Sequence, residues 1–269
     1  MPANSDPISA HILGISHGGA HLSEEIDQVA AEVPLEIRIE GEPAAITMRT
    51  PGDDLDLVAG FLWTEGVIDG LDDIRALRHV DDPGRPQGNT VDVVLAAGVP
   101  AARRRQADRQ FFSSSSCGVC GKATIDRLLV AAPPIANPIQ PTPDLLLSLS
   151  EKLMNAQTGF ARTGGVHGAA LFNLQGQIRV LREDLGRHNA VDKVLGHMLR
   201  NEQSCGDSIL LVSSRASFEI LQKALVAQVP VVCAIGAPSS MAVDLAQRAG
   251  IHLVGFLREG RYNVYKGLV

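Results

Sequence analysis

The chain has 269 residues, of which 45% are hydrophobic and 20% are charged, and its formal net charge is −6. This composition is typical of a folded globular protein, and the length suffices for one large domain or two smaller ones. The negative charge argues against nonspecific nucleic-acid binding, and no apolar run is long enough to span a membrane. The first residues lack a basic and apolar signal pattern, so we expect a cytoplasmic protein.

The first half of the chain predicts a tail followed by a small α+β region. Residues 1–25 are weakly apolar and hold His11, His17 and His21, whose spacing fits no single helix face, so we expect a flexible tail. Residues 26–130 form the α+β region, which ends in a cysteine-containing loop and a helix. Its expected elements are a hairpin of strands 33–39 and 45–48, a helix from about 55 to 66, and strands 74–80 and 90–95.

The segment 113–122, S-S-S-S-C-G-V-C-G-K, is the strongest chemical signal in the chain. Cys117 and Cys120 are spaced C-x-x-C, and each is followed by a glycine. A serine-rich loop precedes them and a helical pattern follows. A helix N-terminus and the neighbouring Lys122 favour the thiolate, which is the nucleophilic form of a cysteine. We therefore predict that Cys117 is a reactive thiol on an accessible loop.

Three other interpretations of the cysteine pair are weaker. A closed structural zinc site needs a second ligand pair. The remaining cysteines, Cys205 and Cys233, are far apart and lie in or near expected buried strands. A thioredoxin-like redox pair would follow a strand at the start of a βαβ unit, whereas a serine loop precedes this one. The glycines and serines argue against an incidental buried pair, so we expect no bound metal.

The second half of the chain begins after a proline-rich segment. Residues 131–143 hold five of the fifteen prolines and predict a semi-rigid linker. Residues 144–269 predict an α/β domain with a parallel sheet covered on both faces, because near-continuous apolar strands alternate with amphipathic helices. The expected strands are 166–172, 177–181, 208–213, 229–235 and 251–257, and the expected helices are 144–155, one opening near 189, 218–228 and 239–249.

Serine and arginine residues follow the last three expected strands. Ligands of open α/β sheets bind beyond the carboxyl ends of the strands. In this chain those ends carry Arg215 in S-S-R-A-S, Ser239 and Ser240 in G-A-P-S-S, and Arg258 and Arg261 in R-E-G-R. Guanidinium groups, hydroxyls and the free N–H groups of helix N-termini suit a phosphorylated ligand. Serines at helix starts also commonly serve as N-caps, and that interpretation stays open.

His167 and His188 are two further titratable candidates. His167 lies in the apolar strand V-H-G-A-A-L-F, where a hydrogen-bonded core histidine is the commoner case. His188 lies in E-D-L-G-R-H-N at a helix start, beside Asp184 and Arg187. A role in proton transfer and a role in a capping network are both consistent with this position.

Seven segments carry a more specific signal, and they occur in this order: T-M-R-T-P-G-D-D-L-D-L-V-A-G-F-L, S-S-C-G-V-C-G-K, T-G-G-V-H-G-A-A-L, E-D-L-G-R-H-N-A-V-D-K-V, S-S-R-A-S-F-E-I-L-Q-K, G-A-P-S-S-M-A-V-D-L-A and G-F-L-R-E-G-R-Y-N-V-Y. Together they resemble the formate dehydrogenase accessory sulfurtransferase family, FdhD. The resemblance runs from about residue 33 to residue 265 and leaves only the N-terminal tail outside.

This resemblance implies a homodimeric sulfur carrier. It implies that Cys117 accepts sulfane sulfur from a cysteine desulfurase as a persulfide, with Cys120 as an auxiliary thiol. The sulfur then passes to the molybdenum, or tungsten, of the bis(molybdopterin guanine dinucleotide) cofactor before that cofactor enters formate dehydrogenase. It also implies a three-layer α/β/α, cytidine-deaminase-like domain. The implied cofactor-binding segment is Phe256, Leu257, Arg258, Glu259, Gly260 and Arg261, near Arg215, Ser239 and Ser240.

Two alternatives to a sulfur carrier remain. A zinc-dependent deaminase needs H-x-E and P-C-x-x-C motifs. Here His167 is followed by Gly168 and Ala169, and no proline precedes Cys117, so this alternative is disfavoured. A noncatalytic chaperone that only binds the molybdenum cofactor would share the arginine-lined site but would give Cys117 no task.

Overall fold

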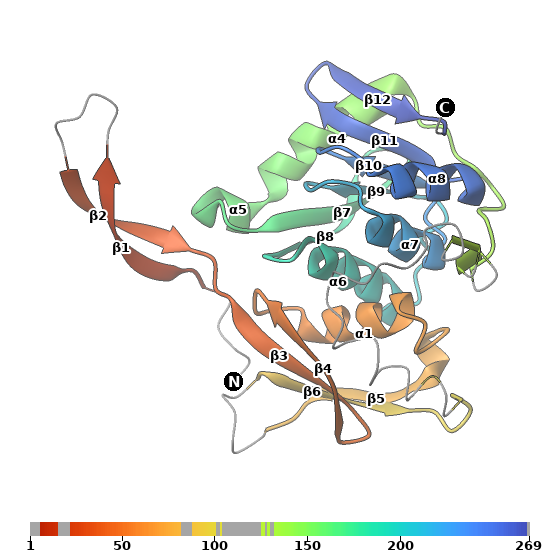
Figure 1. Cartoon of the computed structure of the whole chain (residues 1–269), viewed down its shortest axis with the longest axis horizontal. Helices are drawn as coiled ribbons and strands as arrows, with labels where there is room; N and C mark the ends of the chain where they lie inside the picture. The colour runs from red at the N-terminus through yellow and green to blue at the C-terminus, as the bar shows by residue number, and fades with distance from the viewer. Residues whose placement is uncertain are drawn as a thin grey trace.

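The structure is a computed structural model that describes residues 6–15, 22–81, 88–100, 103, 125–126, 128–129 and 132–267. Within these ranges the strands form three sheets, of two, four and six strands (Figure 1). No helix in the described part of the chain is long and apolar enough to cross a membrane. Cys117 and Cys120 lie outside the described residues.

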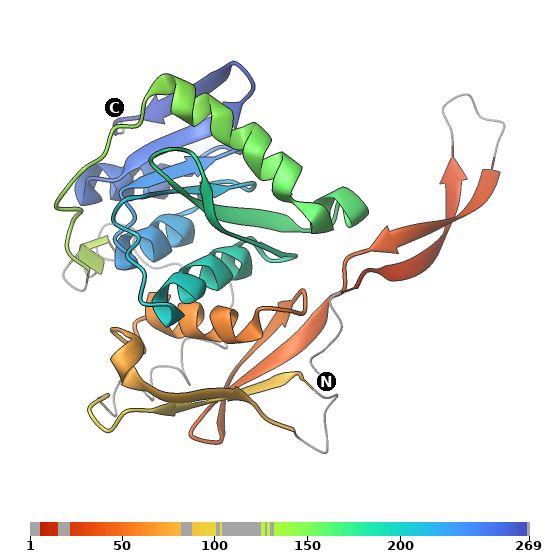
Figure 2. The ribbon, with the colours of Figure 1, turned by 180° about the vertical axis from the view of Figure 1, so that it is seen from behind.

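A β-hairpin precedes the body of the protein. Its strands, β1 (Ile8–Ile15) and β2 (Leu22–Val29), pair antiparallel. The hairpin projects away from the body in both views (Figure 1, Figure 2). Residues 8–15 and 22–25, which we expected to belong to a flexible tail, are therefore strand residues. The isoleucines of β1 suit a strand, but the acidic sequence of β2 gives no clean apolar alternation from which a strand is predicted.

The N-terminal α+β region is built on a four-stranded sheet with the order β4-β3-β6-β5. Its strands are β3 (Val33–Ile39), β4 (Glu42–Arg49), β5 (Ile74–His79) and β6 (Thr90–Leu95). A short 3-10 helix, η1 (Leu71–Asp73), precedes β5. Helix α1 (Asp54–Thr64) buries Leu57, Val58 and Leu62 against the sheet. The alternating apolar residues of β3 and β6 fill the other side of this core.

The C-terminal domain is built on a six-stranded sheet with the order β12-β11-β10-β9-β7-β8. Its strands are β7 (His167–Asn173), β8 (Ile178–Asp184), β9 (Ser208–Val212), β10 (Val231–Ala234), β11 (His252–Arg258) and β12 (Arg261–Tyr265). Strands β9, β10 and β11 are parallel, whereas β7, β8 and β12 pair antiparallel. The sheet is thus mixed, and the expected parallel sheet is confined to its centre. Strand β12 was not expected.

Helices cover both faces of this sheet (Figure 1, Figure 2). On one face lies α4 (Pro143–Ala156), which buries Leu146, Leu149 and Leu153 and is followed by the short helix α5 (Thr158–Thr163). On the other face lie α6 (Arg187–Arg200), α7 (Phe218–Val226) and α8 (Ser240–Ala249). The mixed α/β fold class is confirmed, whereas the specific cytidine-deaminase-like layering stays a prediction.

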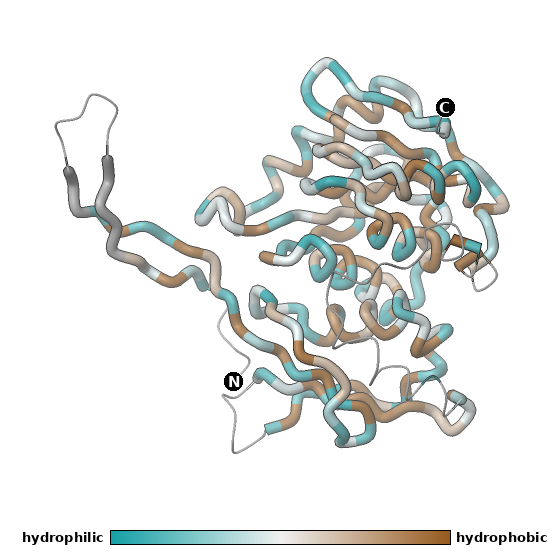
Figure 3. The backbone as a smooth tube through the Cα atoms, viewed as in Figure 1, coloured by the Kyte–Doolittle hydropathy of each residue, from teal (hydrophilic) through white to brown (hydrophobic). Residues whose placement is uncertain are grey.

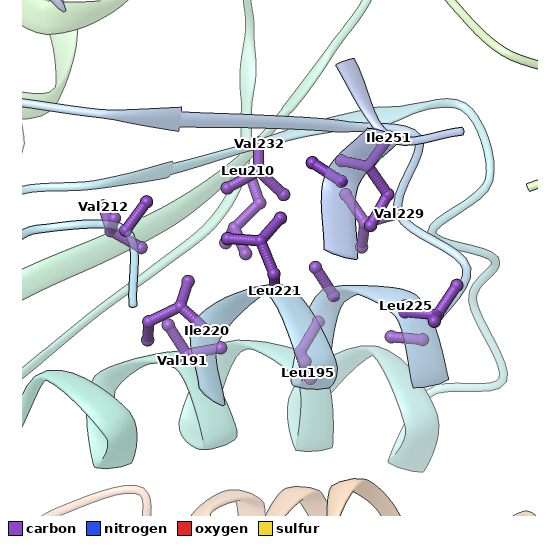
Figure 4. Close-up of a cluster of buried hydrophobic side chains, with 14 of the residues drawn as sticks. Val191, Leu195, Leu210, Val212, Ile220, Leu221, Leu225, Val229, Val232 and Ile251 are labelled. Atoms are coloured by element: carbon purple, nitrogen blue, oxygen red, sulfur yellow. The ribbon is translucent and has the colours of Figure 1, made fainter. Parts of the chain in front are cut away.

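The largest core lies between the six-stranded sheet and helices α6, α7 and α8. Figure 4 shows Leu221 of α7 among residues of α6, β9 and β10, and its side chain is fully buried. Hydrophobic residues follow the strands and helices of the body in Figure 3, and the loops between them are more hydrophilic. Burial of each such aliphatic side chain stabilises the fold by about 1.5–3 kcal/mol.

The proline-rich segment packs against this domain. Ile135 is buried, and its backbone N–H donates to the carbonyl of Ala249 over 2.8 Å. The division of the chain at residues 26, 131 and 144 stays a prediction.

The two halves of the protein meet where α1 crosses α6. Both helices carry a glycine at the crossing. A Cβ atom at Gly60 would lie 1.9 Å from the carbonyl oxygen of Asp192, and one at Gly196 would lie 1.9 Å from the carbonyl oxygen of Asp56. The two backbones therefore touch, and any side chain at either glycine would force the helices apart.

Gly60→Ala and Gly196→Ala are each expected to destabilise the fold, because a methyl group has no space at the crossing. Overpacking of this kind costs about 1–3 kcal/mol, and each kcal/mol lowers the melting temperature by about 2–4 °C. Thermal unfolding is the measurement. Gly98→Ala is the control, since nothing lies within 4 Å of its position. A Gly196→Ala variant that melts with the wild type would contradict the close crossing.

Candidate functional site

The loops after β9 and β10 lie side by side at the carboxyl ends of the parallel strands. The Ala216 N–H donates to the carbonyl of Ala237 over 3.2 Å, and the Gly236 N–H donates to the carbonyl of Ser214 over 3.0 Å. A Cβ atom at Gly236 would lie 3.1 Å from the backbone of Arg215, which is tighter than normal packing. Gly236 therefore allows the two loops to approach closely enough to form one surface.

A cavity of about 920 Å³ opens beside these loops. It lies between the helices α4 and α5 and the ends of the strands β9 to β11. Leu153, Met154 and Phe160 form part of its apolar wall, and Arg258 and Glu259 are charged residues of its lining. A concave, mostly apolar pocket with a few polar groups is the usual form of a small-molecule site.

A second cavity of about 430 Å³ adjoins the first. His167, Ser213 and Ile235 line both cavities, so the two are continuous at these residues. The lining of the smaller cavity also includes Arg187 from the start of α6 and Arg215 from the loop after β9. No aspartate or glutamate lines the smaller cavity within the described part of the chain.

Three arginines at these cavities lack a partner among the described residues. The side chains of Arg187, Arg215 and Arg258 make no hydrogen bond or ion pair with another residue that the structure describes. The Nε of Arg187 is buried and still lacks an acceptor. Buried polar atoms are nearly always hydrogen-bonded, so this Nε would take a ligand oxygen as its partner. Arg215 and Arg258 are exposed, so water can satisfy their guanidinium groups in the absence of a ligand.

His167 lies at the junction of the two cavities. Burial, together with the neighbouring Arg187, lowers its pKa. It is therefore a neutral imidazole near pH 7, able to donate or accept one hydrogen bond. Next to it, the Ser213 hydroxyl accepts the Gly168 N–H over 3.0 Å, which leaves the hydroxyl proton free to donate.

The E-D-L-G-R-H-N segment forms a structural network. The buried Asp184 pairs with the buried Lys193 over 2.8 Å. Its carboxylate also accepts the N–H of Gly186 over 2.9 Å and the side-chain amide of Asn189 over 3.0 Å. These contacts fix the first turn of α6, and with it the position of Arg187. A network around the helix start, one of the two interpretations of this segment, accounts for Asp184.

A second buried charge pair joins α1, α6 and α7. The carboxylate of Asp192 lies 2.9 Å from Lys223 Nζ, and Thr64 donates to it over 2.8 Å. Burial raises the pKa of Asp192 to about 6, although Lys223 opposes that shift. These contacts tie α7 to α1 and α6.

Four residues of the predicted cofactor segment line the larger cavity: Leu257, Arg258, Glu259 and Gly260. Phe256 is not among the lining residues, but its φ angle is 53°, a left-handed conformation that is rare for an aromatic residue. Its N–H donates to the carbonyl of Gly236 over 3.1 Å. Such strain persists only where the surrounding structure imposes it, and it occurs often at functional sites.

The other predicted binding residues, Arg261, Ser239 and Ser240, are not among the lining residues of either cavity. Arg261 is exposed at the start of β12. The Ser239 hydroxyl accepts the N–H of Ala242 over 3.3 Å and therefore caps α8. Ser240 is exposed. The N-cap interpretation thus describes Ser239, and the roles of Arg261 and Ser240 in binding stay predictions.

Of the four cysteines, two lie within the described residues. Cys205 and Cys233 are both buried and free. Burial raises the pKa of the Cys205 thiol to about 12 and that of the Cys233 thiol still further. Both are therefore protonated and inert near neutral pH. In the part of the chain that the structure describes, no cluster of three or more His, Cys, Asp or Glu residues is suited to bind a metal.

The sequence alone did not identify Arg187 or the α4 wall as parts of the site. In the sequence Arg187 is a neighbour of His188 at a helix start, and the apolar face of α4 has the pattern of a core-facing helix. The sequence does show that Arg187 begins a helix directly after a strand. The order β9-β7-β8, which brings that helix start to the carboxyl end of β9, cannot be predicted from the sequence pattern.

Fold and site together define an α/β protein with an arginine-lined pocket at the carboxyl ends of its central parallel strands. A model of the FdhD/NarQ family matches residues 30–268. The chain therefore belongs to the FdhD/NarQ family.

Relatives agree over most of the chain. A protein of Streptomyces coelicolor named "Sulfur carrier protein FdhD" is 48% identical over 252 residues, which cover 91% of this chain and 89% of that protein. A protein of Mycobacterium tuberculosis with the same name is 46% identical over 248 residues, covering 89% and 90%. The crystal structure of a putative formate dehydrogenase accessory protein from Desulfotalea psychrophila superposes with a TM-score of 0.75 at 26% identity, covering 98% of this chain and all of that one.

Stability is expected to depend on pH through His188. Burial, with Arg187 and Lys223 nearby, lowers its pKa to about 4 from 6.5. Between these two pH values the unfolded chain binds a proton at this position and the folded chain does not, so stability falls as the pH drops from 6.5 to about 4. Thermal unfolding across this window is the measurement. His188→Gln removes this contribution, so its melting temperature should fall less steeply; an unchanged slope would contradict the assignment.

Proposed function

We propose that this protein is a sulfur carrier that serves formate dehydrogenase. It accepts sulfane sulfur from a cysteine desulfurase as a persulfide on Cys117 and delivers it to bis(molybdopterin guanine dinucleotide), which it binds as a substrate. The observation that carries this proposal is a pair of arginine-lined cavities at the sheet edge of an FdhD-family chain that also contains C-x-x-C. The names of the relatives support the same role.

The cavities suit one nucleotide arm of such a cofactor. Each guanine dinucleotide arm has an extended organic part and a diphosphate. The larger cavity, about 920 Å³, lies at the upper end of the range for organic ligands. A protein with a net charge of −6 must concentrate positive charge locally to bind a diphosphate, and Arg187, Arg215 and Arg258 do so.

The cysteines support the assignment of the sulfur carrier by exclusion. Cys205 and Cys233 are buried and protonated, so neither can attack a sulfane sulfur. Cys117 and Cys120 are the two remaining thiols. In the proposed step the Cys117 thiolate attacks the terminal sulfur of the donor persulfide, and the donor cysteine leaves as a thiolate. One S–S bond forms as another breaks, so no external oxidant is required.

The proposed assembly is a homodimer. A symmetric dimer presents two equal nucleotide sites, which matches the two guanine dinucleotide arms of the cofactor. In this arrangement Arg215, residues 256–261 and the loop with Ser239 and Ser240 of each protomer contact one arm. The alternative is a noncatalytic chaperone that binds the cofactor through the same cavities and carries no sulfur.

Cys117→Ala is expected to abolish persulfide formation and the maturation of formate dehydrogenase while leaving the fold unchanged. Intact-protein mass spectrometry after incubation with a cysteine desulfurase and cysteine should show one added sulfur atom on the wild type and none on the variant. Cys205→Ala is the control, because its thiol is buried and should not carry sulfur. Cys120→Ala shows whether the second thiol takes part.

If the protein is instead a noncatalytic chaperone, Cys117→Ala should leave the maturation of formate dehydrogenase unchanged. A Cys117→Ala variant that matures formate dehydrogenase as well as the wild type would support it and would sink the sulfur-carrier proposal.

A further inference from the structure

The negative charge of the chain is concentrated at the hairpin of β1 and β2 and the residues that follow it. Arg38 is the first lysine or arginine in the sequence, and six of the 30 aspartates and glutamates precede it. The 24 acidic residues that remain equal the 24 lysines and arginines in number. The net charge of −6 therefore belongs entirely to the first 37 residues, and the rest of the chain is neutral overall.

We infer that the hairpin is a docking surface for the protein that receives the cofactor, and that it binds a basic surface around the cofactor entrance of that protein. Under the proposed function, on which this inference rests, the receiving protein is formate dehydrogenase. The inference gives a role to residues 6–29, which none of the site residues described above includes.

The first argument is the charge of the hairpin. The side chains of Asp6, Glu25 and Asp27 are exposed, and Glu24 is a further acidic residue of β2. A surface of this kind repels nucleic acids and anionic membranes, and it attracts a protein surface that is rich in lysine and arginine. The partner is therefore a basic protein surface.

The second argument is the apolar residues beside these charges. Ile8 of β1 and Val29 of β2 are cross-strand partners, and they are 55% and 39% exposed. Side chains alternate along a strand, so Val29 shares its face of the hairpin with Asp27 and Glu25. An apolar pair next to charged residues is the usual composition of a protein interface, in which an apolar centre is surrounded by a polar rim.

The third argument is that the hairpin lacks support from the body. In the part of the chain that the structure describes, neither strand pairs with a third strand. The hairpin projects from the body in both views (Figure 1, Figure 2). An isolated two-stranded hairpin is marginally stable in water, and a protein bound to it would stabilise it.

The fourth argument is the position of the hairpin beside the larger cavity. Strand β2 contacts α5, and a Cβ atom at Gly165, which follows α5, would lie 3.3 Å from the Cβ of Ala30. Gly165 and Phe160 of this segment both line the larger cavity. A protein docked on the hairpin therefore lies next to the segment that walls the cavity proposed to hold the cofactor.

The chemistry of the cofactor indicates the charge of the receiving protein. Each of the two guanine dinucleotide arms carries a diphosphate, so the entrance that admits the cofactor must be positively charged. An acidic hairpin complements such an entrance. A second copy of this chain offers no such complement, because its own hairpin is acidic and the remainder of the chain has no net charge.

Calorimetry with purified, cofactor-free formate dehydrogenase tests the inference. The double variant Glu25→Lys, Asp27→Lys is expected to bind at least about tenfold more weakly than the wild type, because two attractive charges become repulsive. The matched control is Asp72→Lys, Asp81→Lys, which changes the net charge equally at two exposed positions of the body. The control should bind like the wild type. Wild-type affinity in the hairpin variant, or an equal loss in the control, would overturn the inference.

Salt dependence gives a second measurement that needs no variant to fold. The affinity of the wild type for formate dehydrogenase is expected to fall when NaCl is raised from about 0.05 M to about 0.5 M, because salt screens exposed charges. The hairpin variant should lose most of this dependence. An affinity of the wild type that does not change with salt would contradict docking through charge.

Further measurements on the hairpin variant separate the possible partners. Persulfide loading of Cys117 by a cysteine desulfurase and binding of guanosine diphosphate should both be unchanged. Slower loading with wild-type binding of formate dehydrogenase would assign the hairpin to the sulfur donor and overturn the inference. Dissociation of a wild-type dimer into monomers in this variant, measured by sedimentation, would assign it to a second copy, with the same result.

The proposed function can fail separately from this inference. A wild-type protein that takes up no sulfur on Cys117, but binds formate dehydrogenase through the hairpin, would sink the sulfur step and support the docking surface. A wild-type protein that loads sulfur but does not bind formate dehydrogenase would overturn the docking surface and leave the sulfur step in place.

Discussion

The contact between α1 and α6 is the constraint on which the rest of the structure depends. It is the place where the N-terminal region and the C-terminal domain meet, and Gly60 and Gly196 allow their backbones to touch. Asp192 makes two of the contacts at this crossing. Its backbone carbonyl faces Gly60, and its carboxylate pairs with Lys223 of α7. A buried charge that loses its partner costs about 3–5 kcal/mol, so packing and electrostatics at this crossing reinforce each other.

The same helix connects this crossing to the ligand site. Its middle is fixed by α1, and its first residue is Arg187, which lines the smaller cavity. Lys193, one turn and a half further along, binds Asp184 just before the helix begins. The arginine at the cavity is thus positioned by a buried framework, whereas Arg258 lies on an exposed strand end. Rigid elements of this kind position binding groups more reliably than loops do.

Sequence patterns predicted the secondary structure well where one face of an element is buried. Strands β3 and β6 match their expected ranges, because their apolar residues alternate between turn signals. Strand β12 was not predicted, since R-Y-N-V-Y is a short edge strand none of whose residues is fully buried. The strand-end rule brought Arg215 and Arg258 to the cavities. It did not reveal Arg187, because that residue reaches the site only through the antiparallel pairing of β7 with β9.

The projecting hairpin of β1 and β2 should unfold locally before the rest of the protein does. A two-stranded hairpin is marginally stable in water, and this one contacts the body through β2 and the short helix α5. Ile26, with 66% of its surface exposed, contributes little hydrophobic stabilisation there. Backbone amides of the hairpin should therefore exchange with solvent deuterium sooner than those of β9 and β10, which open only with the global fold. The acidic residues of β2, among them Asp27, oppose aggregation through the unpaired edge of the hairpin, because like charges on two molecules repel.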